Sequence, residues 1–189
     1  MNPLRALTCT AAIALVALLA GCDGETIIGS DSGFHHLSLR NGVLTAHAMG
    51  QPDAVIDAAG DLRIDDKPVA VTPAQRDLLK KYYGDVVAIR QAGIETGKAG
   101  AAMAGHAIGA VASGLAHGDP DSIGPNIEAQ SKDIEAKAMV ICTNVAALRT
   151  DENAITAVLP AFKPYANIDA HEVDDCRAHN RARSGDGSN

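Results

Sequence analysis

Aromatic residues are scarce in this chain, which has no tryptophan, two phenylalanines and three tyrosines among 189 residues. Basic residues are also in deficit, because 16 lysines and arginines stand against 23 aspartates and glutamates. A core without many large rings has to be packed mainly from alanine, valine, isoleucine and leucine, which favours closely packed helices. The net negative charge argues against nucleic acid and against an anionic lipid surface as partners.

Catalytic motifs are missing as well. The sequence contains neither HExxH nor GxSxG, and its carboxylates are spread along segments that we expect to be solvated. Residues 92–99 nearly spell a phosphate-binding loop, but Ala99 stands where a serine or threonine would bind magnesium, and the stretch continues a helix. We therefore expect a protein that is not an enzyme and that holds no cofactor.

An uncharged run stands at the N-terminus, where residues 6–20 follow the single basic residue Arg5. This is the pattern of a signal peptide, and the run is short for a membrane span. It ends in Leu19-Ala20-Gly21-Cys22, a lipobox in which two small residues precede the cysteine that is acylated. We expect cleavage after residue 21 and a mature chain held in the membrane by the lipid on Cys22, with an ordinary cleaved signal or an uncleaved anchor as the alternatives.

The four cysteines have different expected roles. Cys9 leaves with the signal peptide and Cys22 carries the lipid, so Cys142 and Cys176 remain in an oxidising compartment, where we expect a disulfide between them. Without residues 1–21 the formal net charge changes from −7 to about −8, because only Arg5 is removed. The expected location is the bacterial cell envelope, facing the periplasm, and Asp23 favours the inner membrane by the enterobacterial rule.

The mature chain divides into three predicted parts. Residues 22–33 are polar and glycine-rich and predict a flexible tether, residues 34–176 predict a single α+β domain, and residues 177–189 predict a disordered tail. The domain begins with alternating apolar residues over 37–71, interrupted by the turn dipeptide Asn41-Gly42 and a second turn at residues 66–68. This pattern predicts a small antiparallel β-meander with one face on the helices.

A long antiparallel helical hairpin should follow the meander. Its start is predicted at Thr72, which is the N-cap. Pro73 occupies the first helical position, and Gln75 completes a capping box with Thr72. After a turn near residue 120, a second helix is predicted from about residue 121 to residue 148, then a shorter helix over 151–158 and an extended segment over 161–168. The core-facing stripe of the first helix is predicted to consist of Leu79, Tyr82, Val86, Ile89 and Gly93.

The first helix of the hairpin is rich in glycine and alanine between residues 93 and 118. Each glycine inside a helix costs about 1 kcal/mol relative to alanine, so this stretch needs tertiary or membrane packing to stay helical. Pairs of glycines recur at the four-residue spacing of close helix contact. These candidate interaction residues are Gly93, Gly97, Gly105, Gly109, Gly114 and Gly118.

Two motifs resemble a known family. The stretch Leu62-Arg63-Ile64-Asp65-Asp66-Lys67-Pro68-Val69, running into Thr72-Pro73-Ala74-Gln75-Arg76, resembles the signature region of the YggN-like family of bacterial envelope proteins. Similarity extends to the glycine-rich residues 97–102 and to Cys142 with residues 146–148, and so covers roughly residues 37–176. The family has no established function, so the resemblance implies an envelope location and a fold, and it supplies no catalytic residues.

Histidines provide the remaining candidates for metal ligands. His171 and His179 flank Cys176, but they lack a regular ligand spacing and the disulfide competes for the thiol. His35 and His36 stand near His47 across the first hairpin, yet adjacent residues of a strand point to opposite faces. We therefore assign no metal site.

Three classes of function remain. We favour a structural or protein-interaction lipoprotein whose hairpin contacts an envelope partner or a second copy of itself. The alternative is a membrane-engaging glycine-zipper protein in which residues 99–117, which contain no acidic group, insert into the bilayer. A periplasmic carrier of a small ligand or a metal is the third class.

Overall fold

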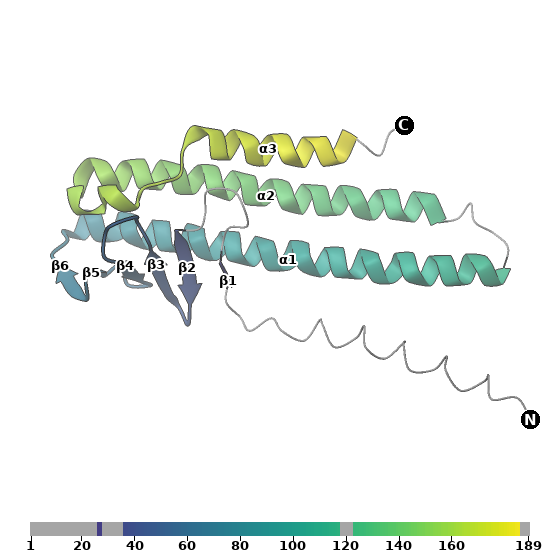
Figure 1. Ribbon diagram of the computed structural model, residues 1–189, viewed down its shortest axis with the longest axis horizontal. Helices are drawn as coiled ribbons and strands as arrows, with labels where there is room; N and C mark the ends of the chain where they lie inside the picture. Colours follow the sequence, from purple (N-terminus) through teal and green to yellow (C-terminus); the bar gives the residue numbers. More distant parts are fainter. Residues whose placement is uncertain (1–25, 28–35, 118–122, 186–189) are drawn as a thin grey trace, which may run out of the picture.

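The computed structural model describes residues 26–27, 36–117 and 123–185. It has an α+β architecture in which six strands are followed by long helices (Figure 1). The predicted signal peptide, the lipidation site Cys22, Asp23 and most of the predicted tether lie outside the described residues.

The sheet is an antiparallel meander in which each strand pairs with the next along the chain. Its strands are β1 (Thr26–Ile27), β2 (Leu37–Arg40), β3 (Val43–Ala46), β4 (Ala54–Asp57), β5 (Leu62–Ile64) and β6 (Lys67–Val69). The predicted meander is therefore confirmed. It has one strand more than predicted, because β1, which lies in the segment predicted to be a tether, pairs with β2.

Two tight turns fix the register of the meander. Asn41 and Gly42 both have positive φ angles, of 50° and 75°, as the two-residue hairpin turn between β2 and β3 requires. The same conformation recurs at Asp65 and Asp66, with φ angles of 54° and 58°. The second turn thus lies one residue earlier than predicted, and Pro68 is part of β6, an edge strand of the sheet, where proline is tolerated.

Helix α1 (Pro73–His117) starts as the sequence predicts. The Thr72 amide donates to the Gln75 side chain at 2.8 Å, and the Gln75 amide donates to the Thr72 hydroxyl at 3.3 Å, which completes the capping box. The predicted stripe is buried from Leu79 to Ile89, but its last member is wrong. Gly93 is exposed, and the buried position in that turn is Ala92.

Helix α2 (Ile123–Val158) runs back along α1 as one continuous helix. The separate helix predicted over residues 151–158 is thus the last part of α2, because Asp151 and Glu152 find partners inside the fold and need not mark a helix start. The hairpin and one face of the sheet enclose a single core at one end of the hairpin (Figure 1). Tyr82 and Phe162 meet edge to face at its centre, with ring centroids 5.5 Å apart.

The C-terminal part of the chain is more helical than predicted. Residues 160–165 form a short 3-10 helix, η2 (Pro160–Tyr165), where an extended segment was expected, because Phe162 and Tyr165 are drawn into the core. Helix α3 (Ala170–Gly185) lies alongside α2 (Figure 1). The expected disordered tail over residues 177–189 is therefore wrong as far as Gly185, and the last four residues lie outside the described part of the chain.

Candidate functional site

The hairpin continues well beyond the core and forms what we call the helical arm, made of α1 residues 93–117 and α2 residues 123–141 (Figure 1). At 1.5 Å per residue, the α1 part of the arm is about 37 Å long. Among the arm side chains that the structure describes, none is buried: the buried residues of α1 end at Ala92, and those of α2 begin at Cys142.

The glycines of the arm face away from α2. The half-buried residues of α1 that face the hairpin partner include Thr96, Met103 and Ala107, which recur at helical spacing. A Cβ atom added at Gly97, or at any of the glycines 93, 100, 105 and 109, would meet no heavy atom within 4 Å. Close contact between the two helices of the hairpin therefore does not explain why glycine stands at these positions.

One exposed face of the arm combines small residues with an isoleucine. With about 100° of rotation per residue, Gly97, Ala101, Gly105 and Ile108 fall on the same side of α1, and we call them the exposed glycine face. All four are exposed, and Ile108 has 73% of its surface accessible. Such a face lets another helix approach closely over the glycines while Ile108 supplies apolar area.

Charge is absent from the outer part of α1 in the arm, and most of the charges on the α2 part of the arm are paired with each other. Residues 99–117 of α1 contain no aspartate, glutamate, lysine or arginine. On α2, Lys132 pairs with Glu128 at 2.7 Å and Lys137 pairs with Asp133 at 2.6 Å, each one helical turn apart. The arm therefore offers no strong field to a nucleic acid or a charged ligand, which fits an uncharged protein surface better.

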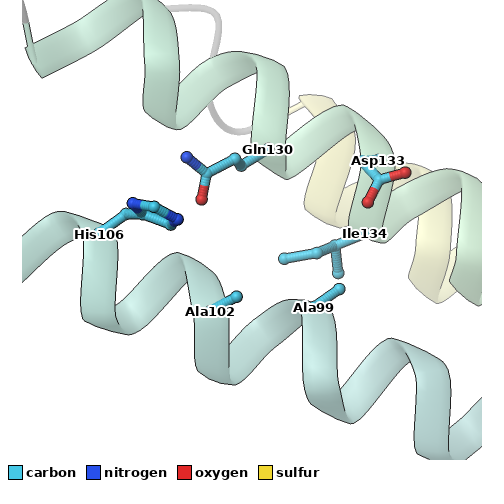
Figure 2. Close-up of a pocket in the computed structure, with 6 residues that line it drawn as sticks. All are labelled: Ala99, Ala102, His106, Gln130, Asp133 and Ile134. Carbon is cyan, nitrogen blue, oxygen red and sulfur yellow. The ribbon is translucent and has the colours of Figure 1, made fainter.

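A shallow groove of about 260 Å³ lies between the two helices of the arm (Figure 2). Ala99, Ala102 and His106 of α1 line one side, and α2 lines the other, with Ile134 and Asp133 among its contributors. Each lining side chain is at least partly exposed, and the Asp133 carboxylate is already paired with Lys137. The groove thus lacks the buried polar anchor that a small-ligand site uses to fix orientation.

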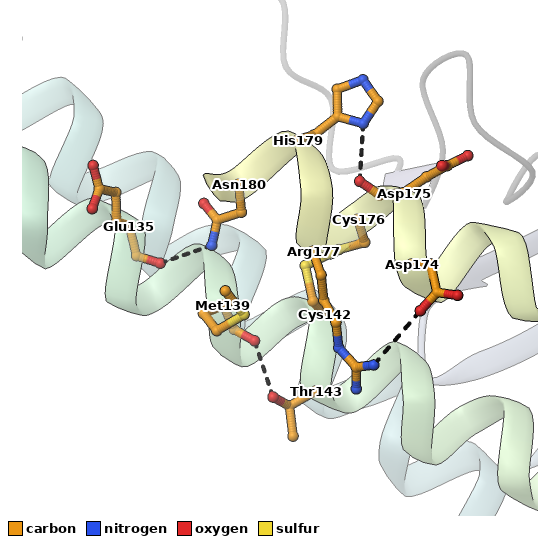
Figure 3. Close-up of a disulfide and its surroundings, with 10 residues drawn as sticks. All are labelled: Glu135, Met139, Cys142, Thr143, Asp174, Asp175, Cys176, Arg177, His179 and Asn180. Atoms are coloured by element: carbon orange, nitrogen blue, oxygen red, sulfur yellow. Dashed lines mark hydrogen bonds and ion pairs between the residues drawn. A yellow bond between two sulfur atoms is a disulfide. The ribbon is translucent and has the colours of Figure 1, made fainter. Parts of the chain in front are cut away.

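The predicted disulfide is confirmed and marks the base of the arm. Cys142 on α2 is bonded to Cys176 on α3, with Cα atoms 5.6 Å apart (Figure 3). Beyond the disulfide, the Asn180 side chain donates to the backbone oxygen of Glu135 at 3.2 Å. Together these contacts hold α3 against α2 where the core ends.

Two of the histidines considered as metal ligands are neighbours, because the His47 amide donates to the His36 backbone oxygen at 2.6 Å across the first hairpin, but the described histidines form no larger cluster. His171 and His179 lie on α3, and the His179 ring contacts the backbone oxygen of Asp175 at 2.9 Å (Figure 3). His47 is bonded instead to Asp53 at 2.7 Å, and His35 lies outside the described residues. Within the described ranges, no group of three or more histidine, cysteine or carboxylate side chains is arranged to hold a metal ion.

Buried acids at the core end of α2 are the feature that sequence reasoning missed. Asp151 is 4% exposed and accepts two hydrogen bonds of 2.7 Å from Lys81, and burial raises the pKa of this carboxyl. Glu152 is 2% exposed and lies at 3.1 Å from the Tyr82 hydroxyl and 2.9 Å from the Ile168 amide. Burial raises the pKa of Glu152 to about 7. The only sequence signal is two acids placed where the helix stripe requires apolar residues.

Comparison of the chain with protein-family models, with curated proteins and with solved structures finds no match. The resemblance to YggN-like proteins therefore stays a prediction. Among the helices that the structure describes, none combines the length and the apolar character needed to cross a membrane. Of the six predicted interaction glycines, Gly118 lies outside the described residues, and the surroundings of Gly114 are not described.

Proposed function

We propose that this chain is a cell-envelope lipoprotein, anchored through Cys22 and facing the periplasm, whose helical arm is a non-enzymatic protein-interaction surface. The lipobox and the resemblance to YggN-like envelope proteins support the location. The disulfide between Cys142 and Cys176 also supports it, because such bonds persist in oxidising compartments.

The exposed glycine face is the observation that carries the interaction role. The two glycines of this face, Gly97 and Gly105, have no atom near the missing Cβ, and together they reduce helix stability by about 2 kcal/mol relative to alanine. Such a cost is offset when another backbone packs closely against the glycines. The partner surface should be an uncharged helix with small residues, supplied by an envelope protein or by a second copy of this chain.

A glycine-to-leucine substitution tests this surface without weakening the helix. Gly105→Leu fills the exposed glycine face, whereas Gly84→Leu is a matched control on the same helix, since Gly84 is also exposed and has no atom near its missing Cβ. Leucine is the better helix former, so both variants should be at least as stable as the wild type. The measurement is recovery of co-purifying proteins from crosslinked cells, with a second, differently tagged copy of the chain expressed alongside.

We expect a reproducible partner, or the second copy, to be lost with Gly105→Leu and retained with Gly84→Leu. Equal recovery with both variants would contradict the assignment of the exposed glycine face. If the purified protein contains stoichiometric metal and no protein co-purifies with the wild type or with either variant, then the protein is a carrier and the interaction role is wrong.

A further inference from the structure

Residues 166–175 form a strap that is fixed at both ends. Before the strap, the Tyr165 hydroxyl donates to the Pro52 backbone oxygen at 2.6 Å, so the end of η2 is bound to the loop between β3 and β4. After the strap, Cys176 is joined to α2 by the disulfide. The strap itself buries Ile168 and Val173 against the core, with 6% of each residue exposed.

The middle of the strap rests on one buried carboxyl group. Glu152 of α2 receives a hydrogen bond from the Ile168 amide on Oε2 and contacts the Tyr82 hydroxyl through Oε1. Beyond these bonds its carboxyl has little access to water, because only 2% of the residue is exposed. A charge on Glu152 is therefore costly, and its partners offset that cost only in part.

The strap carries a second carboxyl with a buried oxygen atom. Glu172 lies in the first turn of α3, where its amide donates to the Asp169 side chain at 3.0 Å. Its Oε2 atom is buried and, among the described residues, has no hydrogen-bond partner. After the larger effect of burial, the negative charge of Glu172 also raises the pKa of Glu152.

The other ionisable groups around Glu152 do not relieve this repulsion. On α1, the Tyr82 hydroxyl is fully buried, and its pKa is raised by burial and by the adjacent carboxylates. On α2, Asp151 is held by Lys81, which also pairs with Asp85 at 3.0 Å. Just before α3, Asp169 adds another negative charge that acts on Glu172. Lys81, the base among these groups, is thus engaged by two carboxylates, and His171 of the strap is exposed.

We propose that Glu152 and Glu172 form a proton-controlled latch that closes the strap over the core when Glu152 is neutral and loosens it when both carboxyls are ionised. The bond from the Ile168 amide is available in either state, because a neutral carboxyl still accepts through its carbonyl oxygen. Ionisation adds an unfavourable buried charge beside Glu172, and lifting the strap relieves it by hydrating Glu152. Opening would expose Ile168 and Val173, while the disulfide keeps α3 attached to α2.

Hydrogen exchange of the Ile168 amide in the full-length protein, purified in detergent, measures this opening directly. Protection factors corrected for intrinsic exchange should be compared between pH 6 and pH 8. With the pKa of Glu152 near 7 in the closed strap and near its usual value of 4.5 in the open strap, linkage gives an opening constant about tenfold larger at pH 8. The Leu159 amide, bonded to the Ile155 oxygen at 2.7 Å at the end of α2, is the internal reference.

Glu152→Gln keeps the shape of the side chain and cannot ionise, so it should abolish the tenfold change at Ile168. Glu128→Gln is the matched control, because Glu128 is exposed on the arm, and it should leave the change intact. Glu172→Gln tests the second carboxyl independently of how well Glu152→Gln folds. Removing the Glu172 charge lowers the pKa of Glu152 in the closed strap, so the change at Ile168 between pH 6 and pH 8 should become smaller than tenfold. A wild-type Ile168 profile that follows Leu159, or a tenfold change that persists in Glu152→Gln, would overturn the latch. A change that stays tenfold in Glu172→Gln would remove Glu172 from it.

Discussion

The disulfide allows a sharp test of what holds α3 in place. Among the α3 residues whose burial the structure describes, 170–181, only Val173 is buried, and an isolated helix of 16 residues is marginal in water. The pairing of Cys142 with Cys176, 34 residues apart, removes chain entropy from the unfolded state worth about 4 kcal/mol on the loop-closure model. Replacing both cysteines by serine should therefore lower the unfolding free energy by up to about 4 kcal/mol.

We expect the loss to begin with α3. In the double-serine variant, the amides of α3 should exchange much faster than in the wild type, while those of α1 and α2 beside the sheet stay protected. Denaturant unfolding can be followed by tyrosine fluorescence, since Tyr82 and Tyr165 are buried in the core and the chain has no tryptophan. If α3 keeps its wild-type protection and the unfolding free energy changes by less than about 0.5 kcal/mol, then side-chain packing holds the helix and our reasoning is wrong.

Three further predictions concern the core and its turns. Because the pKa of Glu152 is raised from 4.5 to about 7 on folding, its contribution to stability is fully present below pH 4.5 and falls by about 3 kcal/mol as the pH rises through 7. Thermal unfolding across this range should show the loss in the wild type but not in Glu152→Gln. Phe162→Ala should cost about 3–5 kcal/mol in urea unfolding, since the ring is fully buried against Tyr82. Gly60→Ala should be more damaging than Gly50→Ala in the same assay, because both have positive φ but only at Gly60 would the new Cβ lie 2.5 Å from a backbone oxygen.

Short-range signals were sufficient for much of the fold. The hairpin at Asn41-Gly42 and the capping box at Thr72 and Gln75 depend on residues no more than three apart, so their outcome could be predicted from the sequence. The disulfide followed from counting cysteines once Cys9 and Cys22 were assigned elsewhere.

The sequence-based predictions were wrong where contacts between residues far apart in the chain decide the structure. Residues 177–185 are polar and predict disorder by composition, yet they are helical as part of α3, which the disulfide and Val173 hold on α2. Likewise, the spacing of the arm glycines suggested close helix contact, but spacing does not say which side of α1 meets α2, and the glycines lie on the open side. Helix orientation is set by the core that both helices share.

The candidate functional features also divide into those that the sequence predicts and those that only the folded structure reveals. The sequence by itself determined the lipobox, the cysteine pair and the order of meander and hairpin, because each depends on residue type and local spacing. Only the tertiary structure decided that the described side chains of the arm are not buried, and that the charge of Glu172 on the strap raises the pKa of the buried Glu152. Those two carboxyls are twenty residues apart in the chain, and a turn through η2 brings them together, so the electrostatics of the latch exist only in the folded molecule.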